Sequence, residues 1–362
     1  MRRSVPSTFA FSALLAAIGV SVSGALPQWL GGDSAIRSDA SLYFLIFSLF
    51  LPILQMNFLA AGMLRCSGNM RIPSIAGILM CILDVVFNFF LIFPSREFSA
   101  GGLTLSIPGA GLGVQGAALG TGLAAITLWY LFTRSSGLKI KAWRKSPSLP
   151  TPPIVRNSIR ISLPMGLEHV VICGAQIMTT VIVAPLGIPA IAANSFAITA
   201  ESLCYMPGYG IADAATTLVG QSLGAGRHRL TRRFAYITVF MGMVVMGIMG
   251  VVMYIFAPQI IGTMTPVEEI RRLGVMALRI EAFAEPMFAA AIISYGVFVG
   301  AANTLVPSLM NFFSIWAVRI SLAAWLAPTM GLKGVWVAMC AELCFRGIIF
   351  LIRLRGKRWM KI

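Results

Sequence analysis

Long apolar runs without a charged residue are the main pattern along the chain. No Asp, Glu, Lys or Arg occurs in Ser4–Gly32, Ala40–Leu64, Phe98–Thr133, Phe234–Val267 or Pro286–Val318. A predominantly apolar run of about 18 residues or more can cross the hydrocarbon core as a helix. The runs lack the apolar/polar alternation of strands in a transmembrane β-barrel. The pattern therefore predicts an all-α membrane protein that crosses the bilayer many times.

Ten spans are expected from these runs. The opening residues resemble a signal peptide, but the repeat described below favours a retained first span. A Gly-rich loop is expected at Ser95–Gly113. The expected spans are Thr8–Leu30, Ser41–Leu64, Pro73–Phe93, Val114–Phe132, Ile161–Val183, Ala190–Val219, Phe234–Phe256, Leu273–Val299, Pro307–Leu326 and Gly334–Ile352.

Part of the pattern occurs twice. Gly68-Asn69 followed by Pro73-Ser74 returns as Ala302-Asn303 followed by Pro307-Ser308, and a proline stands 21 residues before each second proline. Further landmarks, Pro27-Gln28 with Pro258-Gln259 and Gly113 to Gly116 with Gly331 to Gly334, keep the same order. Ordered self-similarity of this kind indicates a duplicated unit.

The duplication predicts a helical bundle in two pseudo-symmetric lobes. Residues 1–133 would form an N-terminal lobe of four spans, and residues 161–362 a C-terminal lobe of six spans with a basic tail. Residues 134–160, rich in Lys, Arg and Pro, are expected to be a cytoplasmic linker. On this interpretation the first lobe lacks two leading spans, either because the reading frame starts late or because the protein is a natural short form.

Charge supports a membrane orientation rather than nucleic-acid binding. The chain is 58% hydrophobic and only 11% charged, with a net charge of +16. Cytoplasmic loops of membrane proteins accumulate Lys and Arg, and ten spans place both termini on the same side. If that side is the cytoplasm, the Lys and Arg residues assigned to the outer face, out of 28 in all, are Arg37, Arg96, Arg271, Arg272 and Lys333.

Enzymatic and metal chemistry find little support in the sequence. The six cysteines lie in or beside apolar runs without metal-like pairing and are interpreted as small hydrophobic residues. The two histidines cannot form a metal site by themselves. Because no nucleophile–base or metal constellation is visible, we expect no enzyme activity, no cofactor and no metal site.

Carboxylates inside the spans are the candidate functional groups, since an ionisable residue in the hydrocarbon region is costly. Asp84, Glu168, Glu201, Glu281 and Glu285 are the candidates for cation coupling. Glu168 follows a proline that frees a backbone carbonyl, which suits a cation or a proton. A buried hydrogen-bonded acid is the alternative for this residue.

Glu281 and Glu285 are expected one helical turn apart, where two like charges would repel. One of them would then hold a proton, or both would share a cation. Alternatively, Glu281 reaches outer water and pairs with Arg279 or Arg272. Tyr205 and Tyr209 follow Glu201 at helical spacing and are candidates for a substrate cavity.

The remaining charges in the spans point to structural pairing. Glu342 and Arg346 stand four residues apart in the favourable order for a helical ion pair. Arg319 is alone in its span and is expected to need a carboxylate from another span.

Four motifs resemble the multidrug and toxic compound extrusion (MATE) family of secondary transporters. They are Pro164-Met-Gly-Leu-Glu168, Met206-Pro-Gly-Tyr-Gly-Ile-Ala-Asp-Ala-Ala215, Leu218-Val-Gly-Gln-Ser-Leu-Gly-Ala-Gly226, and Leu64-Arg65 with Gly68-Asn69 and Pro73. The resemblance covers nearly all of the chain, apparently without the first two family helices. Val299 stands where the family motif usually has Arg.

The resemblance implies two lobes around a cavity that opens to one side at a time. It also implies export of cationic, amphipathic small molecules in exchange for H⁺ or Na⁺. Glu168 matches the acid of the seventh family helix, and Glu285 falls in the helix that supplies a second acid. A lipid-linked oligosaccharide flippase of the same superfamily and a non-transporting truncated fragment are the alternatives. We expect a monomer in the bacterial inner membrane, with both termini cytoplasmic and no nucleic-acid partner.

Overall fold

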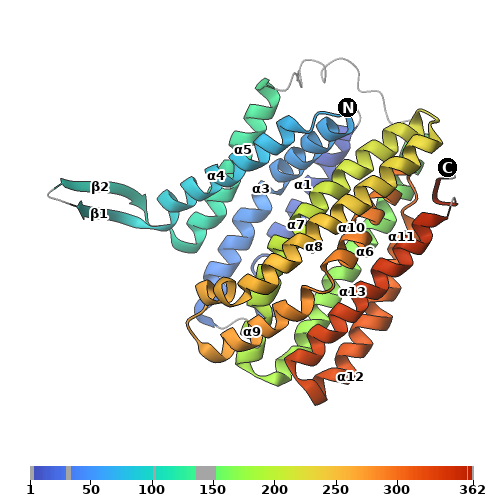
Figure 1. The fold of residues 1–362 in the computed structure, drawn as a ribbon. Helices are drawn as coiled ribbons and strands as arrows, with labels where there is room; N and C mark the ends of the chain where they lie inside the picture. Colours follow the sequence, from blue (N-terminus) through green and yellow to red (C-terminus); the bar gives the residue numbers. More distant parts are fainter. Residues whose placement is uncertain (1–3, 30–33, 101–102, 136–151, 357, 361–362) are drawn as a thin grey trace. The chain divides into compact units, whose positions relative to one another are not determined.

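The structure is a computed structural model that describes the chain except residues 1–3, 30–33, 101–102, 136–151, 357 and 361–362. The chain divides into two compact units, Met1–Thr151 and Pro152–Ile362. Figure 1 shows that both consist mainly of long helices. Most of the predicted linker, residues 136–151, lies outside the described residues.

The first unit contains five helices and one β-hairpin among its described residues. α3 packs against α1 and α5, and α4 packs against α5. The elements are α1 (Ser4–Val22), α2 (Leu26–Trp29), α3 (Ser34–Cys66), α4 (Arg71–Ile92), β1 (Pro94–Ala100), β2 (Leu103–Ala110) and α5 (Gly113–Ser135).

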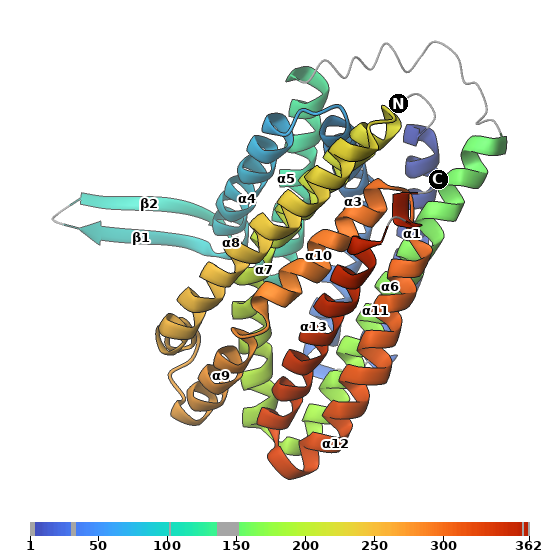
Figure 2. The same cartoon turned by 45° about the vertical axis from the view of Figure 1, so that its right-hand side comes forward.

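The hairpin corrects the expectation of a loop at Ser95–Gly113. β1 and β2 pair antiparallel, with Phe98 opposite Leu105 and Ala100 opposite Leu103. Figure 2 shows the hairpin extending beyond the ends of α4 and α5. The glycines at Gly101-Gly102 and Gly109 make the segment look like a loop, although Leu103 to Ile107 alternate between apolar and polar residues as strands do and Gly109 lies within β2.

The second unit is built around α10, which packs against α7, α8 and α13, while α11 packs against α6. Its elements are α6 (Pro152–Val183), η2 (Ala184–Leu186), α7 (Ile188–Gly224), α8 (His228–Met264), α9 (Glu268–Glu281), α10 (Glu285–Gly300), α11 (Leu305–Phe313), η3 (Ser314–Ile320), α12 (Ser321–Met330), α13 (Leu332–Arg355) and η4 (Arg358–Met360). Because α6 begins at Pro152, the last nine residues assigned to the linker are helical. Proline is well tolerated in the first turn of a helix, so this Pro-rich segment opens α6.

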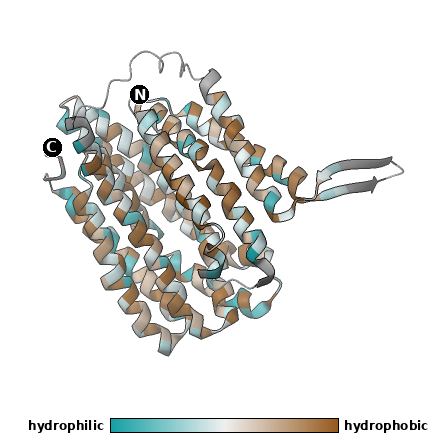
Figure 3. Ribbon diagram, turned by 180° about the vertical axis from the view of Figure 1, so that it is seen from behind, coloured by the Kyte–Doolittle hydropathy of each residue, from teal (hydrophilic) through white to brown (hydrophobic). Residues whose placement is uncertain are grey.

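Eight described helices are long and apolar enough to cross a membrane, and the bent pair α9–α10 would make a ninth. Figure 3 shows apolar residues along the length of these helices. α7 is not among them, although its 37 residues exceed the length that a crossing needs. It carries Asn194, Glu201 and Asp213, so the tenth span stays a prediction.

The duplicated motif forms the same turn in both units. Gly68 and Ala302 have left-handed backbone conformations, with φ of 86° and 56°. The amide of Asn69 donates to Leu64 O at 3.0 Å, and the amide of Asn303 donates to Phe298 O at 2.9 Å. Both are the six-residue hydrogen bond that ends a helix in a Schellman motif. The repeat therefore encodes two equivalent helix ends, each followed by a helix with proline in its first turn.

Candidate functional site

Glu168 is held by hydrogen bonds from two other helices. Tyr295 Oη on α10 donates to its Oε2 at 2.5 Å, and Ser308 Oγ on α11 donates to the same oxygen at 2.6 Å. Asn311 Nδ2 donates to Oε1. The residue is only 7% exposed, and a buried carboxylate needs hydrogen-bond donors to offset the loss of water. Glu168 is therefore a buried, hydrogen-bonded acid, and its role in cation coupling stays a prediction.

This carboxylate lies at the wall of a cavity within the second unit. The cavity has a volume of about 420 Å³, which is in the range of small-molecule sites. Tyr209 and Phe288 supply aromatic surface, while Arg346 and Asp213 add charges of both signs. Among the described residues, no group of three or more His, Cys, Asp and Glu side chains is placed to hold a metal ion.

Glu281 and Glu285 do not lie on one continuous helix, which corrects the expectation that they stand one helical turn apart, although the bent pair α9–α10 can still form the single expected span. α9 ends at Glu281, α10 begins at Glu285, and their axes differ by 61°. Both side chains are 0% exposed, and no hydrogen bond reaches any of their four carboxylate oxygens. The alternative in which Glu281 reaches outer water is therefore wrong. Pro286 lies in the first turn of α10, where a helix needs no backbone N–H from proline, so the proline is compatible with a helix that starts after the break.

Glu201 lies near enough to Glu281 and Glu285 to interact with both electrostatically, whereas Asp84 lies in the other unit. Glu201 is buried on α7. The ring of Tyr205 contacts that of Tyr209 at 5.7 Å between centroids and that of Phe288 at 5.8 Å. Asp84 belongs to the first unit, where Thr121 Oγ1 donates to its Oδ1 at 2.8 Å.

Glu342 and Arg346 meet on α13. Arg346 Nε lies 2.9 Å from Glu342 Oε1, and Arg346 Nη2 donates to Glu342 Oε2 at 3.1 Å. Ser314 Oγ also donates to Glu342. Within the described part of the chain, Arg319 forms no ion pair with a carboxylate, and its Nη2 instead points at the sulfur of Met339. The guanidinium of Arg346 lies over the ring of Phe288, 5.5 Å from its centroid.

Comparison with known proteins places the chain in a family. The sequence profile of the MatE family matches residues 1–90 and 164–325. The chain belongs to the MATE family. This confirms the resemblance carried by the four motifs, and the matched segments include Glu168, its three hydrogen-bond donors, Glu281 and Glu285.

Curated MATE relatives are longer than this chain. "Probable multidrug resistance protein NorM" of Thermotoga maritima is 26% identical over 313 residues, which cover 83% of this chain and 63% of the relative. The protein of the same name from Idiomarina loihiensis is 24% identical over 337 residues, which cover 90% and 71%. The chain thus spans about two thirds of the length of these relatives.

Solved MATE structures share the fold. An outward-facing multidrug resistance MATE family transporter matches with a TM-score of 0.88 at 18% identity, covering 99% of this chain and 78% of the other. A mutant of the Vibrio cholerae MATE transporter VcmN matches with a TM-score of 0.87 at 16% identity, covering 99% and 79%. The prediction of an all-α polytopic membrane bundle with the two-lobed MATE fold is confirmed.

Sequence reasoning did not find the partners of Glu168. Ser308 was visible as part of the repeat, and Asn311 follows it by three residues, on the same face of a helix. That spacing was the available signal. No sequence signal pointed to Tyr295, because it belongs to no repeated motif and lies 127 positions from Glu168.

Proposed function

We propose that the chain is a secondary active transporter that exports cationic, amphipathic small molecules in exchange for H⁺ or Na⁺. The observation that carries the proposal is the buried carboxylate of Glu168 at the wall of an aromatic-lined cavity. Protonation or cation binding there would change the hydrogen bonds that join α6 to α10 and α11. The names of the NorM relatives support the substrate class.

In this mechanism Glu168 is the coupling group. As a carboxylate it accepts from Tyr295, Ser308 and Asn311. A carboxylate has about four acceptor positions, so a proton or Na⁺ would take the one that the three donors leave on Oε1 and would weaken their hydrogen bonds by neutralising the charge. An ion drives a conformational change only if it binds the two states unequally. If α10 or α11 moves relative to α6 between the two states, Glu168 loses donors in one of them and binds the ion with a different affinity.

The cavity chemistry is matched to a cationic aromatic substrate. Tyr209 and Phe288 present ring surface to the cavity, and cations bind favourably over aromatic faces. Acids and bases both line it, so it lacks the basic character that a lipid-linked oligosaccharide flippase is expected to need. From the distribution of Lys and Arg we propose that both termini are cytoplasmic, and we propose that the transporter acts as a monomer in the inner membrane.

The test is transport by the purified full chain in liposomes with an imposed proton or Na⁺ gradient and a fluorescent cationic dye. We expect gradient-driven dye movement in the parent protein and its loss in Glu168→Gln. Glu268→Gln is the matched control, because Glu268 is an exposed acid in the first turn of α9. Dye movement that needs no gradient, or that survives in Glu168→Gln, would refute the proposal.

A further inference from the structure

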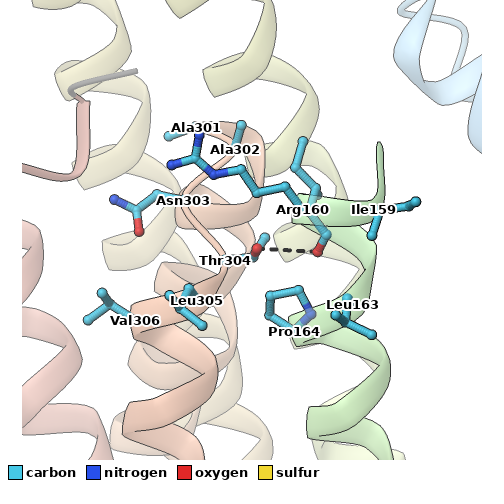
Figure 4. Close-up of a pocket in the computed structure, with 11 residues that line it drawn as sticks. Ile159, Arg160, Leu163, Pro164, Ala301, Ala302, Asn303, Thr304, Leu305 and Val306 are labelled. Atoms are coloured by element: carbon cyan, nitrogen blue, oxygen red, sulfur yellow. Dashed lines mark hydrogen bonds between the residues drawn. The ribbon is translucent and has the colours of Figure 1, made fainter. Parts of the chain in front are cut away.

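A second cavity lies at the basic end of the second unit, away from Glu168. Its volume is about 570 Å³, and it is bounded by the start of α6 and by the turn between α10 and α11 (Figure 4). Thr304 Oγ1 donates to Ile161 O at 3.2 Å and joins the two sides. This cavity has no role in the proposed transport mechanism.

The walls of the cavity are apolar and open to the surroundings. Ile159 and Leu163 on α6 and Leu305 on α11 are exposed and large. α6 and the α11–α12 helix are both apolar enough to cross the bilayer. Exposed apolar side chains at the end of such helices contact acyl chains near the headgroups.

A basic residue, Arg160, borders this apolar surface. Arg160 is exposed, and Figure 4 shows its side chain extending across the pocket toward the turn at Ala301 and Ala302. No ion pair joins Arg160 to an acid among the residues that the structure describes. The nearby Arg353 is already engaged, since its Nη2 donates to Asn303 Oδ1 at 3.2 Å and its guanidinium lies over the ring of Phe298.

The position of Arg160 along α6 fixes its depth. No charged residue occurs from Ile161 to Leu167, so Arg160 is the last base before the apolar part of the helix. A long basic side chain at this boundary reaches the level of lipid phosphates. The pocket thus combines a cation at headgroup depth with apolar walls directly below it.

We propose that this pocket binds one anionic phospholipid. The Arg160 guanidinium would hold the phosphodiester, for which its planar donors are suited, and an acyl chain would lie over Leu163 and Leu305. A zwitterionic lipid carries the same phosphate but no net charge, so it binds less tightly. The inference concerns binding alone and does not depend on whether the chain transports a substrate.

The test is native mass spectrometry of the full chain in detergent, titrated with dioctanoyl phosphatidylglycerol or dioctanoyl phosphatidylcholine. Arg160→Gln should weaken binding of the first phosphatidylglycerol about five-fold, which corresponds to about 1 kcal/mol for one base near the surface. Binding of phosphatidylcholine should change little. Arg160→Lys should keep most of the preference, which separates loss of charge from misfolding.

Arg156→Gln is the matched control, because Arg156 lies one helical turn earlier on α6, is exposed and does not line the pocket. It should bind phosphatidylglycerol like the parent. The proposal is overturned if Arg160→Gln binds as tightly as the parent, or if Arg156→Gln loses as much affinity. Displacement of the lipid by millimolar inorganic phosphate would also overturn it, since the site would then bind a soluble anion.

Discussion

The ion pair between Glu342 and Arg346 allows a quantitative test of packing in the second unit. Glu342 is 0% exposed, and Arg346 contacts both of its carboxylate oxygens. Arg346→Met removes the counter-charge and leaves a buried carboxylate whose remaining donor is Ser314. Removing one partner of a buried pair costs about 3–5 kcal/mol, and we expect a loss of unfolding free energy in this range.

The double variant Arg346→Met/Glu342→Leu should recover part of that loss. Replacing a whole buried pair with apolar residues is often neutral, because the cost of desolvating both charges disappears. Ser314 would lose its acceptor, which costs about 1 kcal/mol. The lost contact of Arg346 with Phe288 subtracts a further 0.5–2 kcal/mol or so. The double variant should therefore remain more stable than Arg346→Met alone.

The assay is a double-mutant cycle by reversible unfolding in mixed detergent micelles. The control is the cycle for Arg271 and Glu268, an exposed pair on α9 with nitrogen and oxygen 3.7 Å apart. Its coupling should be about 0.2–1 kcal/mol. If the coupling between Glu342 and Arg346 is no larger than that of this surface pair, the reasoning from burial is wrong.

Two further predictions use matched pairs of residues. A Cβ at Gly347 would meet the carbonyl oxygen of Met287 at 2.5 Å, whereas one at Gly210 would meet nothing within 4 Å. Gly347→Ala should therefore lower the unfolding free energy by about 1–3 kcal/mol, and Gly210→Ala should raise it by up to about 1 kcal/mol. Equal effects of the two variants in chemical unfolding would contradict the packing of α13 on α10. Trp359 is 1% exposed and contacts the ring of Phe298, whereas Trp325 is 74% exposed. Trp359→Ala should therefore cost about 3–5 kcal/mol and Trp325→Ala much less; a thermal melt of Trp359→Ala that matches the parent would show that the C-terminal segment does not pack on α10.

The sequence predicted the placement of the helices well because the bilayer imposes a strong local rule. Each of the ten expected spans overlaps one described helix or a run of two or three consecutive helical elements. The helix boundaries were less predictable. Pro152 opens α6 rather than ending a linker, and the segment at Leu273–Val299 bends between Glu281 and Glu285 although its residues continue an apolar pattern.

The candidate site was predictable only in part. A carboxylate in an apolar run is visible in the sequence because it breaks a local pattern, and Glu168 was found in that way. Its environment is not local. The three donors come from α10 and α11, while Glu281 and Glu285 are buried without a hydrogen-bond partner, and no spacing along the chain distinguishes the two cases.

The sequence by itself determined that this chain is a multi-spanning helical membrane protein with a duplicated motif, because hydropathy and helix-end signals act over a few turns of one helix. Only the tertiary structure decided which of the described acids accept hydrogen bonds, that Arg160 borders an apolar pocket, and where cavities lie. Those properties depend largely on side chains that folding brings together from distant positions, 127 to 143 residues apart for the donors of Glu168, and the free energy of a buried charge is set by what lies within a few ångströms of it.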